Sequence, residues 1–391
     1  MSASQTGAPG QGRPDMILLG VVAILLAVGL LMVASASIGL GERQHDNAFY
    51  FFERQIIAAV MGLCAAFCML KIPTRVWQRL GPWLAGAAIL LLIVVLVPGL
   101  GRTANGSTRW LNIAGINIMQ VSEPVRLMLL VYVADYAVRR NQEIRSSFFG
   151  FMKPLVIVAV AGALLLAQPD FGSAVLLVGI TFTIMFLAGA RLRDVALTLG
   201  PVVLGFALLA KFSPYRMKRL TGFWDPWADP YGDGFQLTQS LIAIGSGEWT
   251  GLGLGGSVQK LFYLPEAHTD FIFAVIAEEF GLLGSLVMIV LYVLLIWRAF
   301  AIARTAAGRE QFFPAYIAFG LGVWLALQAA INLGVNMGVL PTKGLTLPLV
   351  SYGRSSLLVT LAALGLLMRI DLENRGIVSA TRRRVNGRVA S

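Results

Sequence analysis

A short stretch in the second half of the chain combines ionisable side chains with a long apolar run. Residues 264–281 read LPEAHTDFIFAVIAEEFG and include five ionisable side chains, Glu266, His268, Asp270, Glu278 and Glu279. Ionisable groups are costly inside a lipid bilayer, so those found in membrane helices are functional candidates by default. A carboxylate such as Asp270, at the mouth of such a helix, could accept a proton as a general base.

Each of these residues also has a purely structural interpretation. Asp270 stands where the apolar run begins, and acidic residues favour helix N-termini as caps and as partners of the helix dipole. Glu278 and Glu279 could form ion pairs that lock helices together, although adjacent residues cannot share one helix face. His268 could be a hydrogen-bonding residue at the membrane interface, and its role stays open at this point.

Basic residues elsewhere favour a chemical role for Asp270. Residues 211–268 form the one long segment between apolar runs, and they contain Arg216, Lys218, Arg219 and Lys260. Cations near a carboxylate suggest a phosphate-bearing ligand together with a base. Glu123 and Arg126 lie at i and i+3 near one end of another apolar run, so their side chains can pair.

The composition indicates that the elements positioning these residues are membrane helices. Of the 391 residues, 57% are hydrophobic and only 13% are charged, and the mean hydropathy is +0.75, whereas a soluble domain is about a quarter charged. Apolar runs of about 20 residues, long enough to cross a bilayer, recur along the chain. The sequence therefore predicts an all-α integral membrane protein, a bundle of about ten transmembrane helices with one large extracytoplasmic loop segment. The expected spans are 16–40, 55–70, 82–100, 121–138, 154–167, 172–190, 195–211, 270–297, 315–335 and 348–369.

The basic residues orient this bundle. Lysine and arginine are concentrated in the tails and in alternate short loops, 71–79, 139–153, 191–194 and 298–312. By the positive-inside rule, these loops and both termini are expected in the cytoplasm and residues 211–269 on the outer side. Because the basic residues sit in short clusters between apolar runs, the net charge of +11 does not imply nucleic acid as a partner.

This topology divides the chain into three parts. Residues 1–15 are predicted to be a disordered cytoplasmic tail, 16–369 a single polytopic membrane domain, and 370–391 a basic cytoplasmic tail. Residues 251–256 satisfy the G-x-G-x-x-G pattern, but a dinucleotide site requires a preceding strand in a βαβ unit. No nucleotide cofactor is therefore expected.

Five motifs together resemble the SEDS family (shape, elongation, division and sporulation), most closely its cell-division branch. They are RW at 109–110, QVSEPVR at 120–126, QPDFGSA at 168–174, the long segment 225–281, and NLGVNMGVLPTKGLTLPLVSYGRSS at 332–356. The chain departs from the usual pattern at Val121 and Arg126, where the family usually has proline and lysine. It also has Arg354 where a second glycine is expected, and this arginine could either crowd the last helix or serve as an extra phosphate ligand.

The resemblance implies a peptidoglycan glycosyltransferase that polymerises lipid II, an undecaprenyl-diphosphate-linked disaccharide-peptide, at the division septum of the bacterial cytoplasmic (inner) membrane. Asp270 would be the catalytic carboxylate, acting as a general base or positioning a divalent cation (Mg²⁺ or Mn²⁺) at the diphosphate. The expected substrate-binding residues are Arg109, Trp110, Gln120, Glu123, Arg126, Arg216, Lys260, Glu266, His268 and Ser351. The four basic residues among them, Arg109, Arg126, Arg216 and Lys260, could bind the leaving diphosphate. The expected protein partners are a class B penicillin-binding protein (a transpeptidase) and other divisome membrane proteins.

Three alternatives stay open on the sequence alone. A lipid II flippase would also have many helices and buried charges, but it requires a polar path through the bilayer, and Glu278 and Glu279 are the residues that keep this reading open. A polymerase of the elongation branch would share the chemistry. A non-catalytic scaffold that recruits division proteins would tolerate loss of the Asp270 carboxylate.

Overall fold

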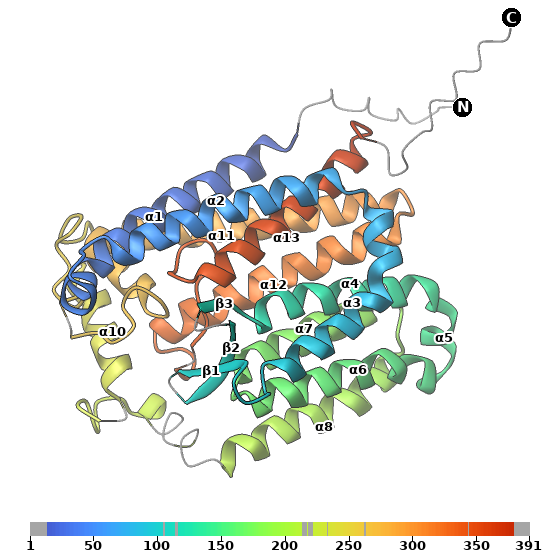
Figure 1. The fold of residues 1–391 in the computed structure, drawn as a ribbon, viewed down its shortest axis with the longest axis horizontal. Helices are drawn as coiled ribbons and strands as arrows, with labels where there is room; N and C mark the ends of the chain where they lie inside the picture. Colours follow the sequence, from blue (N-terminus) through green and yellow to red (C-terminus); the bar gives the residue numbers. More distant parts are fainter. Residues whose placement is uncertain are drawn as a thin grey trace, which may run out of the picture.

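The computed structural model of the chain describes residues 14–104, 106–113, 116–212, 217, 222–232, 234–261, 263–342 and 344–378. Its helices run roughly side by side and form an elongated bundle (Figure 1). The described helices are α1 (Met16–His45), α2 (Tyr50–Lys71), α3 (Thr74–Val94), α4 (Ser122–Arg139), α5 (Asn141–Ser146), α6 (Phe148–Ala167), α7 (Phe171–Leu187), α8 (Leu192–Lys211), α10 (Phe235–Ser246), α11 (Ile272–Gly308), α12 (Phe312–Asn336) and α13 (Arg354–Asn374).

The helical class predicted from the composition is confirmed, and each of the ten expected spans overlaps a helix. Within the described residues, seven helices are long and apolar enough to cross a membrane: α1, α2, α3, α6, α11, α12 and α13. The count of ten crossings is not confirmed, because α4, α7 and α8 fall outside this group. α7 has only 17 residues, and α4 carries the charged residues Glu123, Arg126, Asp135 and Arg139.

Most helix boundaries differ from the expected ones, and α11, for example, ends at Gly308 instead of residue 297. α3 begins at Thr74 and continues through Pro82. Proline removes one backbone hydrogen bond, and a membrane helix tolerates this loss when neighbouring helices surround it. α13 begins only at Arg354, since residues 348–353 form turns, and it continues to Asn374. Part of the predicted C-terminal tail is therefore helical.

The start of α1 and the end of α13 lie at the same end of the bundle (Figure 1). Asp15 is buried and caps α1 by accepting hydrogen bonds from the backbone amides of Ile17 and Leu18, at 3.1 and 3.0 Å. The sequence had placed Asp15 in the N-terminal tail. Its carboxylate also lies 3.7 Å from the Arg375 guanidinium, directly after α13. This contact joins the start of the first helix to the end of the last one.

The most polar helices occupy the middle of the bundle. α4 packs against α3, α7 and α12, and α13 packs against α2 and α11. Their charged side chains Glu123, Arg126, Asp135 and Glu373 are all buried, because protein rather than lipid must surround charge within a membrane. The apolar faces of outer helices, such as α2, are instead exposed.

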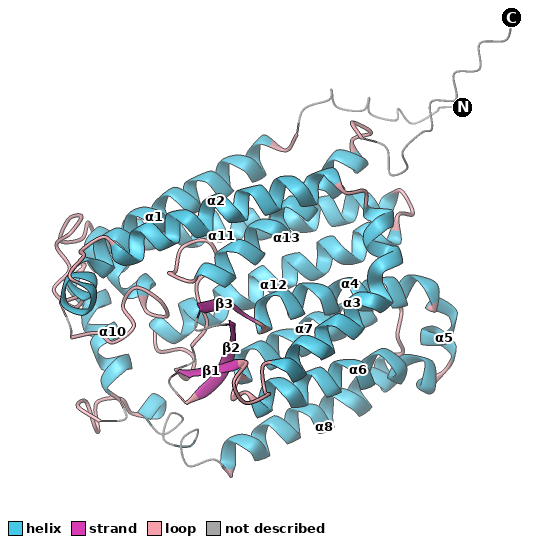
Figure 2. Cartoon of the chain, viewed as in Figure 1, coloured by secondary structure: helices cyan, strands magenta, loops and turns pink. Residues whose placement is uncertain are grey.

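A small sheet, which the sequence analysis did not predict, lies at the end of the bundle away from Asp15 (Figure 2). Its strands β1 (Gly101–Ala104), β2 (Ser107–Ile113) and β3 (Ile116–Gln120) are antiparallel in the order β1-β2-β3. Trp110 in the central strand is paired with Arg102 on one side and with Gln120 on the other. The sheet thereby brings two of the predicted site residues, Trp110 and Gln120, next to each other.

α11 is interrupted at Gly281, whose φ of 65° and ψ of −161° are not helical. The loop 247–253 inserts at this point, where Leu252 N donates to the Glu278 carbonyl and Leu282 N donates to the Glu248 carbonyl, at 3.0 and 2.9 Å. These bonds replace helical ones that the interruption removes. The half-helix 272–280 is therefore hydrogen-bonded to this loop. It begins at Ile272, just after Asp270 and Phe271.

We expect Gly281→Ala to destabilise the protein strongly. This region of φ/ψ space is accessible to glycine almost alone and costs other residues about 1–3 kcal/mol. A Cβ at Gly281 would also lie 2.5 Å from Gly251 N and 2.6 Å from the Trp249 carbonyl carbon, both backbone atoms. The measurement is the thermal unfolding midpoint of the purified protein.

The control is Gly308→Ala in the same helix, where a Cβ meets nothing within 4 Å. This change should leave the midpoint unchanged or slightly raised. Equal midpoints for Gly281→Ala and wild type would contradict the prediction.

Candidate functional site

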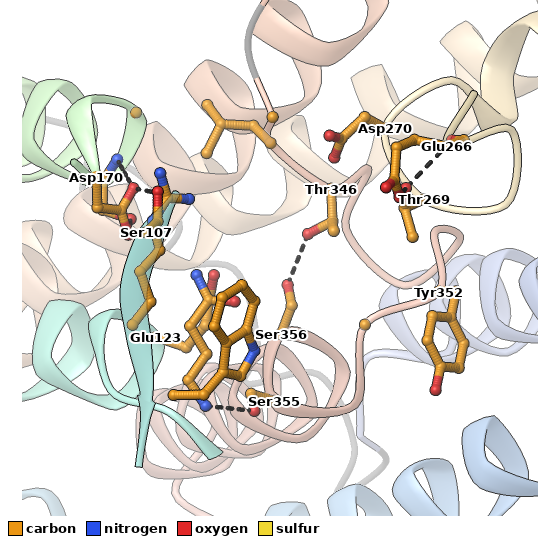
Figure 3. A pocket seen from close by; sticks show the side chains of 18 of the residues that line it. Ser107, Glu123, Asp170, Glu266, Thr269, Asp270, Thr346, Tyr352, Ser355 and Ser356 are labelled. Atoms are coloured by element: carbon orange, nitrogen blue, oxygen red, sulfur yellow. Dashed lines mark hydrogen bonds and ion pairs between the residues drawn. The ribbon is translucent and has the colours of Figure 1, made fainter. Parts of the chain in front are cut away.

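A cavity of about 840 Å³ opens beside the sheet (Figure 3). Its walls come from β2 and β3, the starts of α4, α7 and α13, the segment before α11, and Thr342 with residues 344–346. It collects six of the residues predicted from the sequence, Arg109, Trp110, Gln120, Glu123, Glu266 and Asp270. Segments far apart in the chain thus contribute to one polar cavity.

Asp270 lines this cavity from the segment just before α11. Its backbone carbonyl accepts hydrogen bonds from the side-chain amides of Asn332 and Asn336, both at 2.9 Å. Its carboxylate passes close to Gly344, where a Cβ would lie 2.9 Å from Asp270 Oδ2. Two asparagines of α12 therefore hold the backbone, and a glycine leaves room for the carboxylate.

The interpretation of Asp270 as a helix cap is wrong. α11 begins at Ile272 and its N-cap residue is Phe271, which makes no side-chain capping hydrogen bond. Asp270 lies one residue before that cap and is partly exposed toward the cavity. The carboxylate is thus positioned at the cavity wall and is not the N-cap of α11, although it lies close enough to the helix N-terminus to interact with the helix dipole.

Asp170 lies on the wall that faces Asp270 across the cavity (Figure 3), and Arg109, which also lines the cavity, lies beside Asp170. Asp170 is the N-cap of α7, where it accepts a hydrogen bond from Ser173 N at 3.2 Å. The Arg109 guanidinium, from β2, lies 3.7 Å from the Asp170 carboxylate and donates to the Pro169 carbonyl at 2.5 Å. Because its side chain is still 20% exposed, Arg109 can also contact an anion in the cavity.

The cavity floor is formed by Glu123, which pairs with Arg126 as predicted from their spacing. The two charged groups are 3.4 Å apart, and both side chains are buried. Arg126 itself lies below the floor, where it donates to Gln328 at 3.0 Å and its guanidinium stacks 4.9 Å from the centre of the Trp324 ring. Arg126 therefore holds Glu123 in place and does not line the cavity.

Arg354 adds a second cation to the cavity, at the first residue of α13. Its side chain is exposed, and no hydrogen bond or ion pair of it is found among the described residues. The next residues are fixed, since Gln120 N donates to Ser355 Oγ at 2.8 Å and Thr346 Oγ1 donates to Ser356 Oγ at 3.0 Å. Of the two readings of Arg354 left open by the sequence, this position fits a phosphate ligand at a helix N-terminus, which favours anions.

Besides Arg126, three predicted residues do not line the cavity. Lys260 is 2.7 Å from Glu279 in a separate buried ion pair. Ser351 is buried and accepts a hydrogen bond from Leu347 N at 2.7 Å. His268 is buried between the rings of Phe51 and Tyr352, whose centroids lie 4.9 and 5.4 Å from its own. Arg216 lies outside the described residues.

Glu278 and Glu279, the adjacent acids of α11, both make structural contacts. Glu278 accepts hydrogen bonds from the Ser257 hydroxyl at 2.5 Å and from Val258 N at 3.0 Å. Glu279 pairs with Lys260 and also accepts from Ser35 of α1 at 2.8 Å. These contacts support the interpretation of the two glutamates as locks between segments.

His268 predicts a specific pH dependence of stability. Burial lowers the pKa of its imidazole below the ordinary value of 6.5, although nearby Glu266 opposes this effect. Between 6.5 and that lower pKa, the unfolded chain binds a proton that the folded protein does not. The free energy of unfolding should therefore fall as the pH drops below 6.5, with a slope of at most about 1.4 kcal/mol per pH unit for one proton.

The measurement is denaturant or thermal unfolding at pH 7.5 and at pH 5.5. We expect His268→Gln to lose less stability than wild type between these two conditions. The matched control is His45→Gln, because His45 is the other histidine of the chain and is exposed. The prediction fails if His268→Gln and wild type lose equal stability on acidification.

The sequence analysis missed several cavity residues. Asp170 lies within the quoted QPDFGSA motif but was not selected, although an acid before an apolar run is a typical N-cap signal. Gln236, Thr342 and Thr346 also line the cavity. Their types carry no chemical signal in the sequence, because a threonine or glutamine becomes a site residue only through its place in the fold.

The described residues do not form a complete metal site. Among them, no group of three His, Cys, Asp or Glu side chains is arranged to hold a metal ion. Mg²⁺ is often held by only one or two carboxylates together with substrate phosphates.

Sequence comparison matches the chain to a protein family and to named relatives over most of its length. The family model for cell cycle proteins of the FtsW, RodA and SpoVE type matches residues 15–376. The chain is 54% identical over 361 residues to the "probable peptidoglycan glycosyltransferase FtsW" of Thioalkalivibrio sulfidiphilus, covering 92% of this chain and 90% of the relative. It is 49% identical over 376 residues to the protein of the same name from Legionella pneumophila, covering 95% of each chain.

Solved structures share the fold. One is a chain of a peptidoglycan synthase complex studied for its coordination of polymerization and crosslinking, with a TM-score of 0.75 and 30% identity over 94% of this chain and 99% of that one. Another is the rod shape determining protein RodA of Thermus thermophilus, with a TM-score of 0.69 and 29% identity over 94% and 99% of the two chains. Both similarities extend over nearly the whole chain.

Proposed function

The chain belongs to the FtsW/RodA/SpoVE family of cell cycle proteins, and on that premise we propose that it is a peptidoglycan glycosyltransferase whose active site is the cavity containing Asp270. Its relatives at 49–54% identity carry the name of the cell-division member, FtsW. These identities favour septal polymerisation of lipid II over an elongation-type role, because identity to the elongation protein RodA is 29%.

The reaction joins two lipid-linked saccharides. A sugar hydroxyl of one attacks the anomeric carbon of the other, a new glycosidic bond forms, and the bond from that carbon to the diphosphate breaks. The hydroxyl proton must leave as the new bond forms, and the departing diphosphate carries the electron pair of the broken bond. The active site therefore needs a base and, at a distance from it, positive charge.

The observation that supports the proposal is that one cavity contains both a candidate base and, at a different place, positive charge. The Asp270 carboxylate lies on one wall without a role as helix cap, and it would accept the proton. Arg109 beside Asp170 and Arg354 at the start of α13 line the same cavity, and they would bind the diphosphate. In this arrangement Arg126 supports the floor by pairing with Glu123, and the predicted contact of Lys260 with the diphosphate lacks geometric support.

A divalent cation is part of the proposal only as a charge shared between Asp270 and a bound diphosphate. Such an ion would neutralise part of the leaving-group charge. The partner we propose is a class B penicillin-binding protein, since one structural relative is a chain of a synthase complex that couples polymerization and crosslinking. The protein is a multi-pass membrane protein, and we place it in the cytoplasmic membrane at the septum with both termini in the cytoplasm.

The flippase alternative has weaker support in this geometry. Directly below Glu123, the interior is filled by Arg126, Gln328 and Trp324, which bond to or stack on one another. Glu278 and Glu279, the residues that kept this alternative open, are both engaged in structural contacts. Their carboxylates therefore do not outline a polar path for a headgroup.

The test is polymerisation of lipid II by the purified protein together with its transpeptidase partner, followed by gel separation of glycan strands. We expect a ladder of strands of increasing length. A known polymerase run under the same conditions is the positive control. If that control yields strands and this protein does not, the proposal is wrong, and translocation of lipid II in vesicles becomes the assay of interest.

A further inference from the structure

A second cavity is lined by residues from the last part of α11 and α13 and just beyond them. These helices finish at the end of the bundle away from the sheet (Figure 1). We call this second cavity the inner-end cavity, because the distribution of basic residues assigns this end to the cytoplasm. Its volume is about 270 Å³, and its lining consists of Arg298, Ala301, Ile302, Thr305, Arg309, Asp371, Asn374 and Arg375. Three arginines converge here, in a place that the proposed transferase reaction does not use.

Two of these arginines are already neutralised by protein carboxylates. Arg298 pairs with the buried Asp15 through two hydrogen bonds, one of which is 2.8 Å long. Arg375 pairs with Asp371 at 2.8 Å and approaches Asp15 at 3.7 Å. Arg309 is exposed, and in the described part of the chain its side chain has no hydrogen bond or ion pair. The cavity therefore keeps one positive charge for an anion.

Asn374 supplies a second, independent indication of a ligand. Its side chain is only 1% exposed, and its amide Nδ2 donates to the Ile302 carbonyl at 3.0 Å. Within the part of the chain that the structure describes, its carbonyl Oδ1 has no hydrogen-bond partner, and leaving a buried acceptor unpaired is costly. A ligand that carries a hydrogen-bond donor would satisfy this oxygen.

The surroundings of the inner-end cavity are apolar and face outward. Trp297 is 47% exposed, and its ring lies 5.2 Å from the Arg298 guanidinium. Met16, next to Asp15, is 65% exposed. Trp297 precedes Arg298, which pairs with Asp15, so it lies near the start of α1. Exposed tryptophan is typical of the membrane–water interface, so a lipid headgroup is the anion most accessible to this cavity.

We propose that the inner-end cavity binds the headgroup of a membrane phospholipid, with its phosphate on Arg309 and a headgroup hydroxyl or ammonium group donating to Asn374 Oδ1. The phosphate diester carries one negative charge, which matches the single unpaired arginine. The donor requirement favours phosphatidylglycerol or phosphatidylethanolamine over a bare phosphate. Since α1, α11 and α13 all contribute to or border this cavity, a bound lipid would connect the first and last helices.

The test is native mass spectrometry of the full-length purified protein titrated with phosphatidylglycerol. We expect Arg309→Gln to weaken lipid retention about tenfold, the loss expected for one charge-assisted hydrogen bond. Arg309→Lys, which keeps the charge, should restore most of the retention. Arg304→Gln is the matched control, because Arg304 is an exposed arginine of the same helix that does not line the cavity.

Two outcomes would overturn the proposal. Equal lipid retention by Arg309→Gln and Arg304→Gln would show that the bound lipid belongs to the general annulus around the protein. Displacement of the lipid by inorganic phosphate or glycerol 3-phosphate at the same concentration would show a site for free phosphate instead. Because Arg309 is exposed and unpaired among the described residues, its substitution should leave the unfolding midpoint unchanged.

Discussion

Polymerisation of lipid II should fall by at least about 100-fold when Asp270 is replaced by asparagine, the lower bound for loss of a general base. Asparagine has the same size and keeps the backbone carbonyl that accepts from Asn332 and Asn336. The substitution therefore removes the negative charge and the proton-accepting oxygen while preserving the local fold. The measurement is the initial rate of glycan strand formation with saturating transpeptidase partner, with and without Mg²⁺ or Mn²⁺.

The matched control is Glu266→Gln. Glu266 lines the same cavity but is exposed at its edge, where its carboxylate accepts a hydrogen bond from Thr269 at 2.7 Å. Its substitution should reduce the rate much less than Asp270→Asn does. Wild-type polymerisation by a folded Asp270→Asn protein would remove Asp270 from the chemistry and would revive the reading of the protein as a scaffold.

The largest loss of stability should follow from Arg126→Ala. This change leaves the Glu123 carboxylate buried without its cation, a situation that costs about 3–5 kcal/mol. It also removes the hydrogen bond to Gln328 and the stacking on Trp324. We expect a marked decrease in the unfolding midpoint and in the amount of protein recovered from membranes.

Two further variants separate charge from packing at this position. Glu123→Gln combined with Arg126→Gln removes both charges and should recover part of the lost stability, because no uncompensated charge remains. Arg140→Ala breaks an exposed ion pair with Glu143 and should change stability by no more than about 1 kcal/mol. If Arg126→Ala were as mild as Arg140→Ala, the buried pair would not be a structural requirement of the cavity floor.

The sequence by itself determined the class of the protein, its helices and one buried ion pair, and it proposed Asp270 as the catalytic carboxylate. Apolar runs specify membrane helices because a lipid bilayer admits little else, so each of the ten expected spans overlaps a helix. The spacing of Glu123 and Arg126 specified their pair, since residues three apart on a helix are neighbours. Asp270 was selected because a carboxylate at the mouth of a membrane helix is rare enough to be informative.

Only the tertiary structure decided which polar residues act together. Lys260 and Arg109 are both cations of polar segments, yet one is paired with Glu279 and the other lines the cavity that contains Asp270. Asp170 and Thr346 became cavity residues because α7 and residues 344–346 reach the same space. The partner of a charged side chain depends on contacts between segments distant in the chain, and local spacing does not encode those contacts. The Gly281 interruption has the same origin, since the inserted loop 247–253 supplies the bonds that make it stable.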